Sequence, residues 1–265
     1  TLNRARRSRA TERVEEHKRR DPPEKKFFFG AALAPLEVQL EKIVASDRRM
    51  MSGLQPVLIQ GETGTGKTTL ARWIHQNGPR AAGSLVEMNC SAIPESLAES
   101  ELFGHEKGAF TDARSARMGL FEAANGGTLF LDEVVSLSLG VQAKLLSAIE
   151  DGRIRRVGGN REIPVDVRVI AAANRDLRQL VRENLFREDL LHRLDLFRVS
   201  IPPLRERGDD ILRLAERLVE QACHRHRLPP RKVAEAGQRR LRAYGWPGNV
   251  RELEIGRAHG LNSSH

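Results

Sequence analysis

The chain has 265 residues, 40% of them hydrophobic and 30% charged, a formal net charge of +9 and two cysteines. Its length and composition suit a globular protein of one large or two smaller domains, and no apolar stretch reaches the roughly 18 residues that a membrane span needs. The arginine-rich start lacks the apolar segment of a signal peptide, and two cysteines cannot build a disulfide framework or a metal cluster. We therefore expect a cytoplasmic protein.

The positive charge is concentrated towards the two ends of the chain. Residues 1–26 hold ten Lys and Arg against five Asp and Glu, and residues 225–257 hold nine against three. Basic ends of this kind can bind nucleic acid or acidic partners. A solvated linker at one end and an ordinary charged helical face at the other explain the same charges, and we expect residues 1–26 to be a basic linker or extension.

Between residues 27 and 203, short β-type runs alternate with helical patterns, which predicts an α/β fold with a parallel sheet flanked by crossover helices. Each run is nearly continuous in apolar or β-branched residues, as expected for strands covered on both faces. The runs are Val57–Gln60, Leu85–Met88, Thr128–Leu131, Val167–Ala172 and Leu196–Ser200.

The first run leads into a glycine-rich turn and then a helical segment from Lys67 to His75; the turn is Gly61-Glu62-Thr63-Gly64-Thr65-Gly66-Lys67-Thr68. Strand, turn and helix together predict a loop for the phosphates of a nucleotide, because glycines let backbone N–H groups face a phosphate and the helix start adds partial positive charge. Lys67 suits phosphate oxygens, the Thr68 hydroxyl suits Mg²⁺, and we count Thr69 among the nucleotide-binding residues. A chance glycine turn before a helix is the alternative.

Acidic residues follow the buried run Thr128–Leu131, as the second half of such a site requires. We expect Asp132 to hold Mg²⁺ and Glu133 to polarise the attacking water, although an acid pair can also cap a helix. Asn89 and Asn174 each follow a strand, where ligands of a parallel sheet bind. They are expected to orient the water or touch a phosphate, unless they only form turns.

Later segments predict a hairpin and a helical domain. Gly158-Gly159-Asn160 separates the runs 153–157 and 162–167 and is typical of a hairpin turn. After Pro202-Pro203 the apolar spacing becomes helical, which predicts a small helical domain over 204–255; its first apolar face comprises Ile211, Leu214, Ala215, Leu218 and Ala222. We expect its last helix to end at Glu254 and residues 256–265 to be an atypical tail, for which an artificial origin is one explanation.

The segment Glu101–Ala113 has its aromatic residue, Phe110, flanked by small residues. An aromatic at a loop tip can anchor a partner, or it can fold back on its own domain. With this segment, the sequence from about Phe29 to Glu254 resembles the central AAA+ domain of bacterial sigma-54-dependent transcription activators, the NtrC-type enhancer-binding proteins. The most specific match is Gly108-Ala109-Phe110-Thr111-Asp112-Ala113, which is similar to the family's signature Gly-Ala-Phe-Thr-Gly-Ala.

The resemblance implies an ATPase that converts ATP to ADP and phosphate with Mg²⁺. Residues 27–203 would be the AAA+ nucleotide-binding subdomain and 204–255 its α-helical lid. The loop Gly108–Ala113 would contact sigma-54, and the Gly158–Asn160 hairpin is similar to the family's second loop.

The resemblance also implies roles for single polar residues. Asn89 would hold Glu133 inactive until the γ-phosphate is sensed, and Asn174 would be the first sensor. Arg251, within Trp246–Leu253, would be the second sensor. Arg187 and Arg193 match the arginine fingers, of which we favour Arg193. A finger reaches the neighbouring subunit's γ-phosphate, which implies a hexameric or heptameric ring.

Departures from the family pattern leave alternatives open. Asp112 stands where the family usually has glycine, and Thr68 where many members have Glu. We expect ATP-driven remodelling of the closed complex of sigma-54 RNA polymerase; the alternatives are a nucleotide-binding regulatory module with remodelling impaired by Asp112, or a nucleic-acid motor. A receiver-like domain and a helix-turn-helix are missing from the sequence, so we expect a piece of a longer regulator that binds DNA through another domain.

Overall fold

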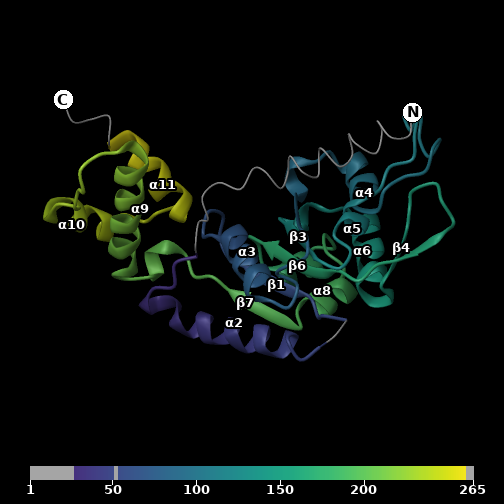
Figure 1. The fold of residues 1–265 in the computed structure, drawn as a ribbon, viewed down its shortest axis with the longest axis horizontal. Helices are drawn as coiled ribbons and strands as arrows, with labels where there is room; N and C mark the ends of the chain where they lie inside the picture. Colours follow the sequence, from purple (N-terminus) through teal and green to yellow (C-terminus); the bar gives the residue numbers. More distant parts are fainter. Residues whose placement is uncertain (1–26, 51–52, 261–265) are drawn as a thin grey trace.

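Five parallel strands form the central sheet, in the order β2-β3-β6-β1-β7. The computed structural model describes residues 27–50 and 53–260, and it describes side chains up to Glu254; the expected extension 1–26 and residues 261–265 of the expected tail lie outside this part. The predicted parallel sheet is confirmed, with each predicted strand present to within one residue at either end (Figure 1). The strands are β1 (Val57–Gln60), β2 (Leu85–Asn89), β3 (Thr128–Asp132), β6 (Arg168–Ala173) and β7 (Phe197–Ser200).

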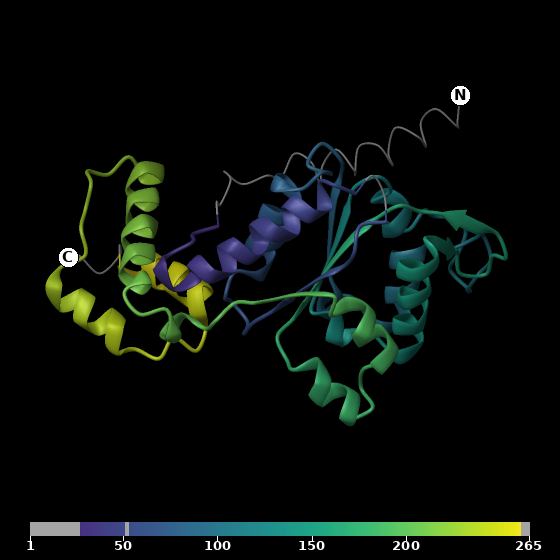
Figure 2. The same ribbon diagram turned by 90° about the horizontal axis from the view of Figure 1, so that it is seen from below.

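Alternate residues of the strands enter two separate hydrophobic cores, because successive side chains of a strand point to opposite faces. Val57 and Ile59 of β1 pack in one core and Leu58 in the other. Figure 2 shows purple and blue helices on one side of the sheet and teal helices on the other. Burial on both faces explains why the strands are continuous apolar runs.

Helices of different chain segments cover these two faces. One face carries α2 (Ala34–Asp47) and α3 (Lys67–Asn77), and the other carries α4 (Glu95–Phe103), α6 (Leu139–Asp151) and α8 (Glu188–Leu194). The shorter connecting elements are η1 (Ala31–Leu33), η2 (Cys90–Ala92), α5 (Leu120–Ala123), η3 (Val134–Ser136) and α7 (Leu177–Arg182).

A third core lies in the helical region after β7, at the left of Figure 1. This region comprises η4 (Leu204–Glu206), α9 (Asp210–His226), α10 (Glu235–Ala243) and α11 (Asn249–Gly260). The apolar face predicted for its first long helix is confirmed, since Ile211, Leu214, Ala215, Leu218 and Ala222 are all buried. Among the described residues, no helix combines the length and the apolar character that crossing a membrane requires.

The end of α11 corrects one prediction. We expected the last helix to stop at Glu254, but it continues through Gly260. Extending an existing helix adds one hydrogen bond per residue fixed, without the cost of a new nucleus. The glycines at 256 and 260 cost only about 1 kcal/mol each relative to alanine, which is too little to end the helix at once.

The predicted hairpin is present but shorter than its β-type runs. β4 (Arg153–Arg155) pairs antiparallel with β5 (Glu162–Pro164). Val157, which we expected in the first hairpin strand, instead donates its N–H to the Gly104 carbonyl at 2.9 Å and accepts from the N–H of Glu106 at 3.0 Å. The hairpin tip therefore pairs with the loop that follows α4.

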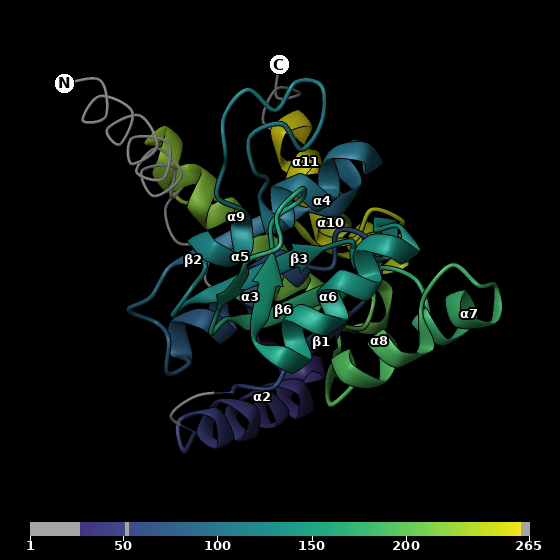
Figure 3. The ribbon, with the colours of Figure 1, turned by 90° about the vertical axis from the view of Figure 1, so that its right-hand side faces the viewer.

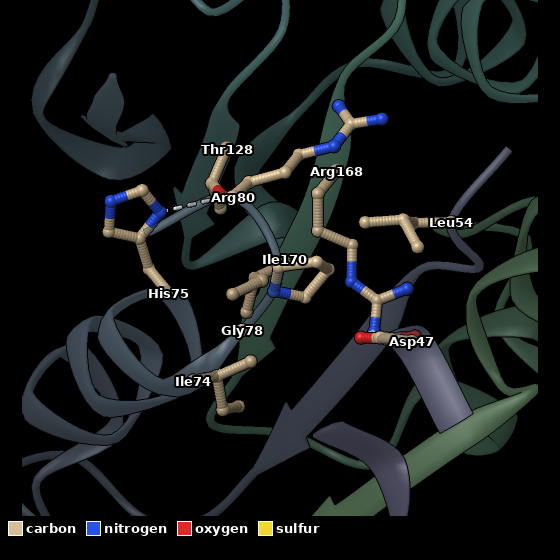
Figure 4. A pocket seen from close by; sticks show the side chains of 10 residues that line it. Asp47, Leu54, Ile74, His75, Gly78, Arg80, Thr128, Arg168 and Ile170 are labelled. Atoms are coloured by element: carbon tan, nitrogen blue, oxygen red, sulfur yellow. Dashed lines mark hydrogen bonds and ion pairs between the residues drawn. The ribbon is translucent and has the colours of Figure 1, made fainter. Parts of the chain in front are cut away.

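A buried ion pair joins α2 to β6 at the amino edge of the sheet. Figure 4 shows the Arg168 side chain directed at Asp47 beside a small cavity, with His75 bonded to Thr128 nearby. Arg168 Nη2 donates to Asp47 Oδ2 at 2.6 Å, and the two side chains are only 4% and 3% exposed. Burial lowers the pKa of Arg168 to about 10 and raises the pKa of Asp47 despite its partner. The pair lies at the edge of the sheet opposite the glycine-rich turn.

Candidate functional site

The glycine-rich turn connects the carboxyl end of β1 to the start of α3. Gly64 and Gly66 have φ angles of 82° and 104°, a left-handed conformation that favours glycine. Thr65 closes the turn, because its N–H and hydroxyl donate to the Glu62 carbonyl at 3.3 and 2.8 Å. The segment Gly61–Thr68, called the phosphate loop below, is therefore a tight concave turn capped onto a helix N-terminus, which suits an anion.

Lys67 is buried in the phosphate loop. Its side chain is 5% exposed, and Nζ donates to the carbonyls of Gly61 and Glu62 at 2.9 and 3.3 Å. Nζ also lies 3.6 Å from Oε1 of Glu133. The buried Lys67 ammonium already lies near one anion, the Glu133 carboxylate. It is also placed to neutralise a phosphate that enters the loop.

The two acids expected at the end of β3 lie beside the phosphate loop. Asp132 Oδ2 accepts from the Thr68 hydroxyl at 3.4 Å, so the two expected Mg²⁺ ligands are neighbours. Glu133 follows in the left-handed region, at φ 55°. Burial raises the pKa of Glu133, and the charge of Asp132 raises it further, against the lowering by Lys67. Glu133 Oε2 is buried without a hydrogen-bond partner among the described residues.

Asn89 lies at the same edge of the sheet, where its side chain bonds to Ser91. It pairs in register with Asp132 across β2 and β3. Its Oδ1 accepts from the N–H of Ser91 at 3.0 Å and from the Ser91 hydroxyl at 2.8 Å, which caps η2. The expected Asn89–Glu133 partnership stays a prediction; in this conformation Asn89 bonds to Ser91 and Glu133 pairs with Lys67.

Asn174 contacts the phosphate loop rather than Asp132. It follows β6, and its Nδ2 donates to the Thr63 hydroxyl at 3.3 Å. The side chain is exposed, so it can bond to a group that enters the loop.

The two expected arginine fingers are held within their own chain, away from its phosphate loop. Arg187 makes a bidentate pair of hydrogen bonds to Asp189, with Nε–Oδ1 and Nη2–Oδ2 distances of 3.0 and 2.6 Å. Arg193 Nη1 donates to Gln55 Oε1 at 2.9 Å, and its Nε is buried without a partner in the described part of the chain.

The helical region contributes contacts that the sequence did not predict. Arg251 was expected there, and its backbone N–H donates to the Gly64 carbonyl at 3.3 Å. The residues that were missed are Arg205, Arg207 and Asn249, which bond to the phosphate loop. Asn249 belongs to the Trp246–Leu253 segment, so that motif was a signal; the two arginines had none. Phe27, also missed, lies over Gly66.

The loop after α4 presents Phe110 at the surface, and Figure 3 shows it reaching beyond the helices at the top of the view. Phe110 is 39% exposed and packs edge-on against His105, with ring centroids 4.9 Å apart. The loop closes through a 2.8 Å bond from the Gly108 N–H to the Ala113 carbonyl. Asp112 is exposed and is absent from the residues with positive φ, so aspartate at this family glycine position adds no left-handed strain.

Comparisons with known proteins cover most of the chain. The family model described as "Sigma-54 interaction domain" matches residues 35–200, and "AAA+ ATPase lid domain" matches residues 205–257. The anaerobic nitric oxide reductase transcription regulator NorR of Klebsiella pneumoniae (strain 342) is 53% identical over 234 residues, which are 88% of this chain and 44% of that protein. NorR of Salmonella paratyphi B is 54% identical over 223 residues, 84% of this chain and 43% of that protein. The chain thus spans less than half the length of these curated relatives.

Solved structures show the same fold. NtrX from Brucella abortus in complex with ADP superposes with a TM-score of 0.79 at 32% identity, over 97% of this chain and 54% of that one. The NtrX structure in complex with ATP gives a TM-score of 0.79 at 31% identity, with the same coverage of both chains.

Proposed function

The chain belongs to the sigma-54 interaction domain family with an AAA+ ATPase lid, and we propose that it hydrolyses ATP to remodel the closed complex of sigma-54 RNA polymerase. The observation that carries the catalytic half is one cluster at the carboxyl edge of the sheet. There the Lys67 ammonium and Thr68 hydroxyl of the phosphate loop meet the Asp132 and Glu133 carboxylates. Family neighbours solved with ATP and with ADP support a nucleotide as the ligand.

The residues of this cluster suit Mg²⁺-dependent phosphoryl transfer to water. Among the described residues, no group of three or more His, Cys, Asp and Glu could hold a metal alone, which fits an ion that needs the nucleotide's phosphates as ligands. Thr68 and Asp132 supply hard oxygen ligands for Mg²⁺, which neutralises phosphate charge when bound. Lys67 would exchange the Gly61 and Glu62 carbonyls for phosphate oxygens.

Glu133 is the group we assign to the attacking water. Its side chain is only 14% exposed, and its Oε2 has no hydrogen-bond partner within the part of the chain that the structure describes. It can therefore accept a hydrogen bond from water and orient it toward the phosphate that Lys67 binds. Asn174 would contact the γ-phosphate from the neighbouring strand, and Asn89 would act only after leaving Ser91.

The exposed loop Gly108–Ala113 is the contact surface we propose for sigma-54. Phe110 presents an aromatic ring at the tip, with Thr111 and Asp112 exposed beside it. The base of the loop pairs with the β4–β5 hairpin through Val157. Force from the nucleotide site would reach the polymerase through the Gly108–Ala113 loop and the β4–β5 hairpin.

Assembly into a homo-oligomeric ring completes the proposal. Neither Arg187 nor Arg193 bonds to its own phosphate loop in the described structure. We infer that the arginine finger comes from a neighbouring copy, with Arg193 as the favoured residue. DNA would be bound by a domain that this chain does not include.

The test is phosphate release from ATP with the whole chain and two variants. Glu133→Gln keeps the shape of the side chain but removes its negative charge and its ability to accept a proton. The variant should bind ATP, while hydrolysis falls by about 10²-fold or more. Lys67→Ala should lose ATP binding. Hydrolysis at an unchanged rate in Glu133→Gln would overturn the assignment of the base.

A further inference from the structure

Asn249 joins the helical region to the phosphate loop and is completely buried, with 0% exposure. Its Nδ2 donates to the Thr63 carbonyl at 3.0 Å and to Glu62 Oε2 at 3.1 Å, while its Oδ1 accepts from the N–H of Leu204 at 2.7 Å. One amide therefore holds the phosphate loop, η4 and the start of α11 together. Asn249 adopts a left-handed φ of 53°, a conformation that asparagine tolerates better than most residues.

Arg205 completes the contact from η4. Its Nη1 and Nη2 donate to the two carboxylate oxygens of Glu62 at 2.9 and 2.6 Å. Hydrogen bonds from Arg205 and then from Asn249 lower the pKa of Glu62 to about 2. The Glu62 carboxylate is therefore charged at every pH at which the protein would be assayed.

Bonds from the helical region reach each residue from Glu62 to Thr65. Besides Glu62 and Thr63, the Gly64 carbonyl accepts from the Arg251 N–H at 3.3 Å, and the Thr65 carbonyl accepts from Nη2 of the buried Arg207 at 3.0 Å. Peptide groups are planar and trans, so the carbonyl of one residue and the N–H of the next point in opposite directions. The carbonyls of Thr63 and Thr65 point toward the helical region, called the lid below. The N–H groups of Gly64 and Gly66 therefore point away from the lid.

We propose that Arg205 and Asn249 are positioning residues that hold the phosphate loop, through Glu62 and Thr63, in its nucleotide-binding shape. Docking of the lid on Glu62 then sets how tightly the phosphates are held and how fast the nucleotide leaves. This proposal rests on the nucleotide binding proposed above. It adds that the lid acts on the loop directly, in addition to any contact that Arg251 makes with the nucleotide.

The experiment measures the dissociation rate of a fluorescent ADP from the whole chain by rapid mixing. Arg205→Ala and Glu62→Gln alter half-exposed side chains, and each should speed dissociation about tenfold, the equivalent of one charge-assisted hydrogen bond. The double variant should be no faster than either single one, because both lose the same interaction. Arg205→Lys should recover part of the loss, since it keeps the charge without the two-pronged geometry.

Two controls separate positioning from general damage. Arg213→Ala removes an exposed arginine of the same lid, on α9, and should leave the dissociation rate unchanged. Asn249→Asp keeps the acceptor for Leu204 and loses the donor to Thr63 and Glu62, so it should release ADP faster than Arg205→Ala. The melting temperatures of the Arg205, Glu62 and Arg213 variants should stay within about 4 °C of the parent value, a change of about 1 kcal/mol or less. Asn249→Asp buries a carboxylate beside Glu62 and should melt lower than these variants.

Hydrogen exchange of residues 61–68 without nucleotide gives a second readout. Exchange should speed up in Arg205→Ala and Glu62→Gln but not in Arg213→Ala. Unchanged exchange and unchanged ADP release in the first two variants would overturn the positioning role. If the parent chain binds no ADP, the proposed function fails, and faster exchange in the same two variants still supports the contact between lid and loop.

Discussion

Glu133 lies in an environment that suits the catalytic role proposed for it. Burial raises its pKa, while the nearby Lys67 keeps the ionised form accessible. Its φ of 55° is uncommon for a residue with a side chain, and such conformations persist where the surroundings enforce them. In the described structure the Glu133 side chain makes no capping hydrogen bond at the start of η3, and its carboxylate lies beside Lys67, so these contacts favour a catalytic role over helix capping.

The raised pKa predicts the pH dependence of ATP hydrolysis. A base must be deprotonated, so kcat/KM, which reports the free enzyme, should rise with pH on an acidic limb centred above 4.5, the ordinary value for a glutamate. Folding stability should change in the opposite direction: the folded state holds this proton more tightly, so stability falls as pH rises from 4.5 through the raised pKa. Measuring kcat/KM from pH 5 to 9 checks the limb.

Glu62 and Glu133→Gln provide the controls for that profile. Glu62 has a pKa near 2, so it does not titrate in this range. The residual activity of Glu133→Gln should lack the limb. An identical acidic limb in this variant would assign the titration to another group.

A buried ion pair, Asp47–Arg168, joins α2 to β6. Asp47 ends α2 and Arg168 begins β6, and both side chains are almost fully buried. Asp47 Oδ1 and two nitrogens of Arg168 have no partner in the described structure. A pair with unsatisfied atoms adds little net stability, but leaving one of its charges alone is costly.

Replacing one residue of the pair should therefore destabilise the protein more than replacing both with apolar residues. We expect Asp47→Ala or Arg168→Met to lower the free energy of unfolding by about 3–5 kcal/mol, and the double change Asp47→Leu with Arg168→Met to cost clearly less. Urea denaturation measures all three. Lys144→Ala, which breaks the exposed pair with Glu99 on the sheet's other face, should cost less than about 1 kcal/mol. A double variant as unstable as the sum of the singles would contradict this view.

The elements were predictable where local patterns decide them. Continuous apolar runs located the strands because the sheet is buried on both faces, and the spacing of Ile211 to Ala222 located α9. The end of α11 was missed because the glycines after Glu254 are weak breakers. The hairpin was overestimated because Val157 pairs with the loop after α4, a partner distant in sequence.

The candidate site was predictable only in part for the same reason. Lys67, Thr68, Asp132 and Glu133 follow strands, so the topology brings them together as expected. The bonds of Arg205 and Arg207 to the phosphate loop depend on how the lid docks, which no local pattern specifies. No local pattern specified either that Glu133 pairs with Lys67 or that Asn89 bonds to Ser91 in this conformation.

The proposed ring makes catalysis depend on neighbouring copies of the chain. Arg193 does not bond to its own phosphate loop in the described structure; its side chain donates to Gln55 instead. The specific ATPase rate should therefore rise with protein concentration, as copies associate. Arg193→Ala should lower kcat by about 10³-fold or more, in keeping with the loss of an arginine finger.

A mixing experiment tests the shared site directly. Glu133→Gln retains Arg193, and Arg193→Ala retains Glu133, so interfaces between the two variants can contain one complete site. Mixing the inactive variants should restore part of the activity. A rate that is independent of concentration, together with no recovery on mixing, would contradict catalysis across the interface.

We propose that ATP turnover by this chain acts on sigma-54 through Phe110. Its most direct test is binding of sigma-54 to the chain with and without an ATP transition-state analogue, for the parent, Phe110→Ala and Asp112→Gly. We predict binding that requires the analogue, loss of binding in Phe110→Ala with ATP hydrolysis retained, and binding by both the parent and Asp112→Gly. Hydrolysis of ATP by the parent and Asp112→Gly, with sigma-54 bound by neither, would contradict the claim.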